Sequence, residues 1–233
     1  METDHKIRDS RILKWIYDRL YLAFGPRKWW PADTPFEVIV GAILTQNTAW
    51  LNVERAIGNL KEEGCLTPQG LRLIERSRLA QLIRPSGYYN QKAQKLKEFI
   101  GFLFAGHKGS LDLMFKTDPL ILRQELLGIK GIGPETADSI LLYAGNFPIF
   151  VVDAYTRRFL SRHNLIGEQA NYSSIQNYFM DNLPCDVKLF NEFHALIVQL
   201  GKEICKPKPN CAVCPLRELE EIVSKFSALR ADF

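Results

Sequence analysis

The fold of this chain is decided by the stretch Leu126–Arg158, which reads LLGIKGIGPETADSILLYAGNFPIFVVDAYTRR. Within it, Lys130-Gly131-Ile132-Gly133 cannot continue a helix, because glycine is costly in a helix interior. Pro134 suits only the first turn of a new helix. Apolar residues then recur at helical spacing until Gly145, at Ala137, Ile140, Leu141 and Ala144. The stretch therefore predicts two helices joined by a tight hairpin.

The hairpin has the properties of a site for nucleic-acid backbone. Its glycines leave the main chain bare, so a phosphate can approach closely, and N–H groups at the start of the following helix favour an anion. Lys130 adds positive charge. We expect Lys130, Gly131 and Gly133 to hold backbone phosphate without reading base sequence, because phosphate contacts position a protein and base contacts specify.

One acidic residue, Asp153, lies 20 residues after Gly133 and directly before another helical segment. An aspartate in that place is a favoured helix N-cap. A helix N-terminus would also keep its carboxylate ionised, so a structural cap and a functional anion are compatible interpretations.

Together these motifs resemble the helix-hairpin-helix (HhH-GPD) DNA glycosylase superfamily. In that family the hairpin is followed by a Gly/Pro segment, here Gly145–Pro148, and then by a catalytic aspartate, here Asp153. The likeness to endonuclease III runs from about Pro35 to Pro215. The hairpin pattern alone would also fit a non-enzymatic DNA-binding protein.

The remaining periodicity is helical, and the predicted fold class is all-α. A capping box with proline at the first helical position, Thr34-Pro35-Phe36-Glu37, opens one of the helices. No convincing alternating strand pattern occurs, although residues 147–152 are apolar enough for a short extended piece. The expected helices cover residues 10–24, 35–44, 51–63, 68–82, 90–105, 119–127, 134–144, 155–163, 174–182 and 187–204.

The resemblance, rather than periodicity, implies two helical lobes. A continuous central lobe would cover residues 28–147 and contain the hairpin. Residues 1–27 and 148–233 would form the second lobe, which includes a cysteine-rich loop at residues 205–214.

The resemblance also indicates which reaction step is absent. Lyase-competent members carry a lysine two residues after the last glycine of the hairpin, and this lysine attacks the sugar to form a Schiff base. The corresponding residue here is Glu135, and a carboxylate cannot form an imine. We therefore expect a monofunctional glycosylase, although Glu135 would equally suit a solvated first turn.

Three of the chain's four tryptophans are candidates for a base pocket. Tryptophan in a small domain is usually core, and a core role is the alternative for each. However, Trp29-Trp30-Pro31 and the later Trp50 resemble residues that line the base pocket in the bacterial 3-methyladenine DNA glycosylase branch. Lys202, in the last long expected helix, resembles a lysine that reaches the same pocket.

Gln46 and Asn47 lie where related enzymes place residues that fill the gap left by a flipped nucleotide. A plain polar turn between helices is the alternative.

The five cysteines are odd in number and argue against a disulfide framework. Cys205, Cys211 and Cys214 resemble the [4Fe–4S] loop of many endonuclease III relatives, which carries four cysteines. The expected fourth position is Glu220, and the first gap is one residue shorter than usual. An intact cluster, an altered cluster and a loop without a cluster are three open alternatives, and the fourth ligand is unknown. The chemistry itself would need no cofactor.

Composition sets the remaining expectations. The 233 residues are 46% hydrophobic and 24% charged with a formal net charge of +4, as in a soluble globular protein with at most a mild preference for polyanions. No apolar run reaches the roughly 20 residues of a membrane span. We expect a cytoplasmic or nucleoid-associated monomer that acts on double-stranded DNA.

The function predicted first is a base-excision-repair DNA glycosylase that flips out and hydrolytically removes an alkylated purine of the 3-methyladenine type. An N3-alkylated purine is cationic, so it stacks well on tryptophan and leaves easily. Two alternatives are an endonuclease III-like pyrimidine or mismatch DNA glycosylase and a non-catalytic DNA-binding protein in which Asp153 is only a cap.

Overall fold

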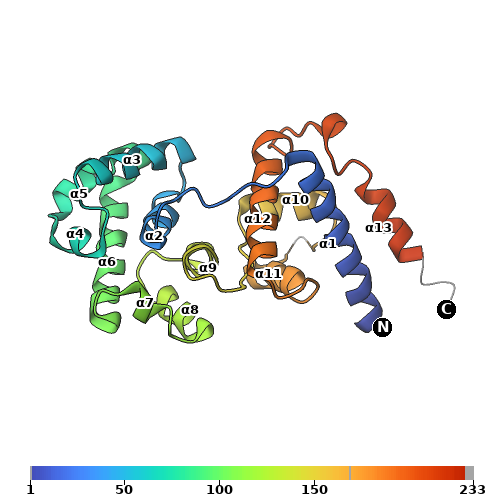
Figure 1. The fold of residues 1–233 in the computed structure, drawn as a ribbon. Helices are drawn as coiled ribbons and strands as arrows, with labels where there is room; N and C mark the ends of the chain where they lie inside the picture. The colour runs from blue at the N-terminus through green and yellow to red at the C-terminus, as the bar shows by residue number, and fades with distance from the viewer. Residues whose placement is uncertain (1, 168, 229–233) are drawn as a thin grey trace. The chain divides into compact units, whose positions relative to one another are not determined.

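The computed structural model describes residues 2–167 and 169–228, and within them the fold is all-α, as predicted, with no strand. The chain divides into two compact units, one formed by Met1–Trp29 with Pro148–Phe233 and the other by Trp30–Phe147 (Figure 1). The expected division into a central lobe at residues 28–147 and a second lobe from both chain ends stays a prediction.

The unit Trp30–Phe147 contains the hairpin. Its helix α2 packs against α3, α6 and α9 (Figure 1). Its helices are α2 (Pro35–Leu44), α3 (Trp50–Glu62), α4 (Pro68–Leu73), α5 (Arg76–Leu82), α6 (Tyr89–His107), α7 (Leu111–Met114), α8 (Pro119–Leu127) and α9 (Pro134–Ser139), with a 3₁₀ turn at Arg84–Ser86 and a π-helical turn at Ile140–Ala144.

The other unit is organised around α12 (Val187–Glu203), against which α1 and α10 pack. Its further helices are α1 (Glu2–Phe24), α10 (Ala154–Arg162), α11 (Tyr172–Met180) and α13 (Leu219–Ala228), with a 3₁₀ turn at Cys211–Val213. Gly201 lets α10 approach α12 closely, because a Cβ at that position would overlap the Tyr155 ring.

The helix starts follow the predicted capping residues. Thr34 Oγ1 accepts a hydrogen bond from the Glu37 N–H at 3.1 Å and opens α2. Asp118 accepts from the N–H groups of Leu120 and Ile121 and opens α8. Side-chain caps of this kind are local in sequence, which is why they could be predicted.

One predicted helix, at residues 68–82, is wrong, because α4 and α5 are separate and the backbone is extended at Ile74 and Glu75. The cause is Lys97 of α6, whose ammonium donates to the carbonyl oxygens of Leu71 (2.8 Å), Arg72 (3.1 Å) and Ile74. These are carbonyls at the end of α4, so a distant cation ends the helix.

The two helices that flank the hairpin are clamped by a buried ion pair. Arg123 of α8 donates from Nε to Asp138 Oδ1 at 2.6 Å and from Nη2 to Oδ2 at 3.0 Å. Asp138 lies in α9 and is fully buried. Bidentate geometry fixes the angle between the helices as well as their distance. The hairpin's own apolar side chains, Ile129 and Ile132, are buried.

The segment before Asp153 forms no strand in the described residues, and its apolar side chains anchor it in the core. The Phe150 ring stacks on Phe179 with centroids 3.8 Å apart. Gln176 Nε2 donates to the Phe150 carbonyl at 2.7 Å, and the Tyr172 hydroxyl accepts from the Val152 N–H at 3.3 Å. The backbone is therefore held by α11 up to the residue before Asp153.

Candidate active site

Asp153 is the N-cap of α10, and its two carboxylate oxygens have different partners. Oδ1 accepts hydrogen bonds from the Thr156 N–H at 2.7 Å and the Thr156 hydroxyl at 2.9 Å. Oδ2 lies 3.7 Å from Nε2 of His194, and the two side chains are only 10% and 7% exposed. The cap is thus satisfied through one oxygen, while the second faces an imidazole.

Burial of the Asp153 carboxyl acts to raise its pKa, but the nearby His194 imidazole and the two Thr156 donors act in the opposite direction and prevail. The net shift is a lowered pKa, so the group is a carboxylate at neutral pH. An ionised carboxylate that is nine-tenths buried is the kind of group that functional sites maintain.

Sequence analysis missed His194, which lies on the buried face of α12 between Phe190 and Ile197. The signal was present, because a histidine on an otherwise apolar helical face needs a polar partner. What the sequence did not contain was the identity of that partner, which lies 41 residues earlier in the chain.

The predicted base-pocket residues fall into one group in each unit. In the first, Lys202 Nζ lies 5.4 Å from the centroid of the Trp29 ring, within the range of a cation–π contact. The segment before Trp29 is fastened to α12 by Arg27, whose N–H donates to Glu192 Oε1 at 2.6 Å and whose Nη2 donates to Gln199 Oε1 at 3.0 Å.

In the second group, the Trp30 ring meets Trp50 edge-on at 5.3 Å and Tyr143 at the same distance with tilted planes. Gly41 makes room for it, since a Cβ there would lie 3.1 Å from Trp30 Nε1. Trp50 Nε1 donates to Glu54 at 2.7 Å. Pro31 is exposed. Tyr143 is a further aromatic neighbour that sequence analysis did not single out.

Gln46 and Asn47 have different environments, although both were predicted to fill a gap. Gln46 is bound to the hairpin, because Nε2 donates to the Thr136 hydroxyl at 2.9 Å and to the Gly131 carbonyl at 3.3 Å, while Oε1 accepts from Lys95. Asn47 is exposed, with a positive φ of 54°. Of the two residues, Asn47 is therefore the one whose side chain is exposed at the turn.

The hairpin presents its donors to solvent. Lys130 and Gly131 are exposed, and within the described chain the N–H groups of Gly131 and Gly133 donate to no protein acceptor. Gly131 has φ 92°, a conformation that favours glycine, and a Cβ there would collide with the stem of Lys95. Glu135 is exposed in the first turn of α9.

Comparison with known proteins identifies the family. The model of the HhH-GPD superfamily of base excision DNA repair proteins matches residues 40–185. The chain belongs to this superfamily. It is 50% identical over 205 residues to the protein named "Putative DNA repair glycosylase MJ1434" of Methanocaldococcus jannaschii, which covers 87% of this chain and 93% of that protein.

Solved structures agree with this assignment. The crystal structure of the Helicobacter pylori 3-methyladenine DNA glycosylase bound to 1,N6-ethenoadenine matches with a TM-score of 0.73 and 30% identity over 84% of this chain and 97% of that one. A trapped endonuclease III–DNA covalent intermediate shares the fold, with a TM-score of 0.78 and 22% identity over 93% of this chain and 97% of that one. The HhH-GPD protein is thus a DNA glycosylase of base excision repair. In its described part, no helix has the length and apolar character needed to cross a membrane.

The cysteine loop of this glycosylase lines a cavity of about 420 Å³. Cys205 is buried, Cys214 half-buried and Cys211 exposed, and the cavity also includes His163 and Glu220. Within residues 2–167 and 169–228, no three His, Cys, Asp or Glu side chains are grouped so as to hold a metal ion. As placed, these side chains do not fit the ligand set of a [4Fe–4S] cluster.

Arginine side chains of α10 hold the loop instead. Arg162 donates to Cys205 Sγ at 3.2 Å and to the carbonyl oxygens of Lys206 (2.6 Å) and Pro207 (2.9 Å). Arg158 donates to the Cys205 carbonyl at 2.7 Å. The loop conformation is therefore supported by the helix that begins at Asp153.

Lys92 of α6 ties together two turns on the hairpin-containing unit. Its side chain is 2% exposed, and Nζ donates to the carbonyl oxygens of Leu44 at 2.8 Å and Ser86 at 2.6 Å. Leu44 precedes the Gln46–Asn47 turn, and Ser86 precedes Gly87 and Tyr88, both of which have positive φ. The two turns and Lys92 line one cavity of about 210 Å³.

Burial, together with the nearby charge of Lys95, lowers the pKa of Lys92 from 10.5 to about 8. As the pH rises above about 8, Lys92 loses its proton in the folded chain, whereas in the unfolded chain it keeps the proton up to about 10.5. The contribution of this group to stability therefore rises with pH across the interval from about 8 to 10.5.

Replacing Lys92 by methionine should loosen both turns, because it removes the donor of two buried carbonyls while keeping the length of the side chain. The free energy of unfolding should fall by about 1–3 kcal/mol. Hydrogen–deuterium exchange should accelerate at residues 45–48 and at 87–89. Lys97→Met is the matched control, since Lys97 caps carbonyls from the same helix and its loss should accelerate exchange near residues 71–74 instead. Unchanged exchange at both turns in Lys92→Met would show that they do not depend on this lysine.

Proposed function

We propose that this DNA glycosylase removes an alkylated purine of the 3-methyladenine type from duplex DNA by water attack and leaves an abasic site. The observation that carries the proposal is the Asp153 carboxylate, buried yet kept ionised by His194 and Thr156. The relative from Helicobacter pylori is named a 3-methyladenine DNA glycosylase and is 30% identical to this chain over 84% of its length, which supports the substrate class. The proposal includes action as a monomer in the cytoplasm or nucleoid.

Asp153 would act where positive charge develops. Cleavage of the bond between base and sugar gives the sugar oxocarbenium character, and a fixed carboxylate in a water-poor site stabilises that charge. Oδ2 is the oxygen available for this task, because Oδ1 is occupied by the two donors of Thr156. The same carboxylate can accept a proton from the attacking water.

His194 is proposed as a positioning residue rather than a catalytic one. It contacts Asp153 from α12 and supports the ionised form of the carboxyl. With Oδ1 held by Thr156 and Oδ2 facing His194, the carboxylate loses little freedom when substrate binds, which is the advantage of a preorganised charge.

The substrate class follows from the chemistry of the aromatic residues. A purine alkylated at N3 is cationic, and a tryptophan face attracts a cation. The Trp29 ring lies 5.4 Å from the ammonium of Lys202, so this ring already takes part in a cation–π contact, which supports the proposal. We assign contacts with the flipped base to Trp29, Trp30, Pro31, Trp50 and Lys202, and the gap-filling role to Asn47 with Gln46 as its support.

The proposed enzyme is monofunctional because no amine replaces the lyase lysine. Glu135 stands at that position, exposed in the first turn of α9. Borohydride treatment during reaction should therefore trap no covalent protein–DNA adduct at wild-type Glu135, because a carboxylate forms no imine to reduce. An endonuclease III preparation treated in parallel gives the positive signal. A covalent protein–DNA adduct trapped with the wild-type protein would overturn the monofunctional assignment.

Replacing Asp153 by asparagine should lower base release from methylated DNA by about 10²–10³-fold, because the charge opposite the developing cation is lost. Asparagine is an equally good N-cap, so folding and DNA binding should change little. Asp186→Asn is the matched control, since Asp186 caps α12 by accepting from the Leu189 N–H at 2.7 Å.

Chromatography of released bases from methylated DNA measures the effect and tests the substrate at the same time. Release of 3-methyladenine or 7-methylguanine by the wild-type protein supports the proposal. No release from methylated DNA, together with release of oxidised pyrimidines from oxidised DNA, would move the assignment to the endonuclease III-like alternative. Equal base release by Asp153→Asn and Asp186→Asn would remove Asp153 from the mechanism.

Replacing His194 by glutamine should raise the pKa of Asp153, because the charge that supports the carboxylate disappears. Base release needs the carboxylate, so the acidic limb of the kcat profile should move to higher pH, while the rate on the alkaline side of that limb falls less. A purely structural role for His194 would lower the rate at every pH and leave the limb in place, and that result would contradict the positioning role.

A further inference from the structure

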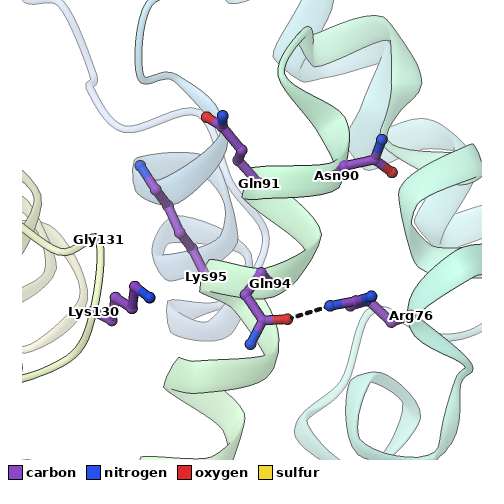
Figure 2. A pocket seen from close by; sticks show the side chains of 7 residues that line it. All are labelled: Arg76, Asn90, Gln91, Gln94, Lys95, Lys130 and Gly131. Atoms are coloured by element: carbon purple, nitrogen blue, oxygen red, sulfur yellow. Dashed lines mark hydrogen bonds between the residues drawn. The ribbon is translucent and has the colours of Figure 1, made fainter.

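A cavity of about 440 Å³ adjoins the hairpin on its α6 side and shares Lys95, Lys130 and Gly131 with the hairpin region described above. Its lining comprises three cations, three carboxamides and one glycine, namely Arg76, Lys95, Lys130, Asn90, Gln91, Gln94 and Gly131. Figure 2 shows the amides and Lys95 along one stretch of α6, with Arg76 on one side and the hairpin residues Lys130 and Gly131 on the other. No carboxylate is among the lining residues.

Helical spacing explains why α6 contributes four of these side chains. Asn90 and Gln94 are four residues apart, and so are Gln91 and Lys95, which gives two adjacent rows on one face. Arg76, the first residue of α5, donates from Nη1 to Gln94 Oε1 at 2.8 Å. Gln94 in turn donates from Nε2 to Glu98 Oε1 at 2.5 Å, so both polar atoms of this carboxamide are engaged within the protein.

The hairpin wall of the cavity is fixed by Gln46 and Lys95. Lys95 donates to Gln46, which in turn donates to the Gly131 carbonyl. The stem of Lys95 occupies the space that a Cβ at Gly131 would need, so hairpin and helix are in close contact. The wall is therefore a defined surface rather than a set of independent lysines.

The charges in the cavity are only partly used by the protein. Lys130 makes no hydrogen bond or ion pair with any residue that the structure describes, and the same is true of the Asn90 and Gln91 side chains. Carboxamides can serve either sign of charge, but the cations decide that the occupant is an anion.

We infer that this cavity binds a phosphodiester group of the DNA strand, next to the phosphate held by the hairpin N–H groups, with Lys130 and Arg76 as its charged contacts. The inference rests on the proposed function only in taking duplex DNA as the ligand. Phosphates recur at about 3.4 Å of helix axis per strand, so a backbone held at the hairpin must bring a second phosphate close by. The cavity opens beside Gly131, where that phosphate would arrive.

The test is the salt dependence of binding to an undamaged duplex, measured by fluorescence anisotropy over a series of KCl concentrations. Each phosphate contact contributes close to one unit to the slope of log K against log salt. Arg76→Gln should reduce the slope by about one unit, and Arg76→Gln with Lys130→Gln by about two. Arg76→Gln is the diagnostic change, because Lys130 also belongs to the hairpin.

Arg78→Gln is the matched control. Arg78 lies on the same helix as Arg76, but it is paired with Glu63 at 2.8 Å and does not line the cavity. The slope should be unchanged in this variant. An identical slope for Arg76→Gln and Arg78→Gln overturns the inference. Thermal unfolding of each variant confirms that a changed slope does not come from a changed fold.

A second arm separates DNA from a free phosphate compound. Inorganic pyrophosphate is titrated against wild-type protein and Arg76→Gln by calorimetry. Pyrophosphate binding that depends on Arg76, combined with an unchanged DNA slope in Arg76→Gln, would assign the cavity to a small anion and overturn the inference.

Measuring base release as well distinguishes a failure of this inference from a failure of the proposed function. If Arg76→Gln lowers the DNA slope while the wild-type protein releases no alkylated purine, the phosphate site stands and the substrate assignment fails. If alkylated purine is released and Arg76→Gln matches Arg78→Gln, the substrate assignment stands and the phosphate site fails.

Discussion

A buried carboxylate is tolerated only where donors surround it, and the unit built on α12 is arranged around that constraint. Thr156 supplies two donors to Asp153 from the first turn of α10, and His194 approaches from α12. Because Gly201 allows α10 and α12 to pack closely, the imidazole and the carboxylate meet at 3.7 Å. The anchored segment through Phe150 fixes where α10 begins.

The hairpin depends on contacts of a different kind. Its glycines permit the turn, but its orientation comes from the Arg123–Asp138 pair and from Gln46 and Lys95. Of these residues, Gln46 and Lys95 also border the cavities beside the hairpin. A DNA-binding loop with so little side chain of its own must take its rigidity from its neighbours, and here α6 provides much of it.

Features whose cause lies within a few residues of sequence could be predicted, and features that depend on tertiary contacts could not. The N-caps Thr34, Asp118 and Asp153 bond to N–H groups two or three residues away, so composition over a few positions was enough. His194, Lys92 and Tyr143 act on residues brought close by packing, and no short pattern contains that information. The break between α4 and α5 was mispredicted for the same reason, since Lys97 ends α4 from a different helix.

Helix α10 has a second attachment that concerns the chemistry. Asp153 stands at its N-terminal end, and Arg158 and Arg162 reach the cysteine loop from its later turns. Nine residues of helix make a rod of about 13 Å at 1.5 Å per residue. The cysteine loop thus supports α10 at the end opposite Asp153, and freeing Arg158 or Arg162 from the loop would let the whole rod tilt and shift the carboxylate relative to His194.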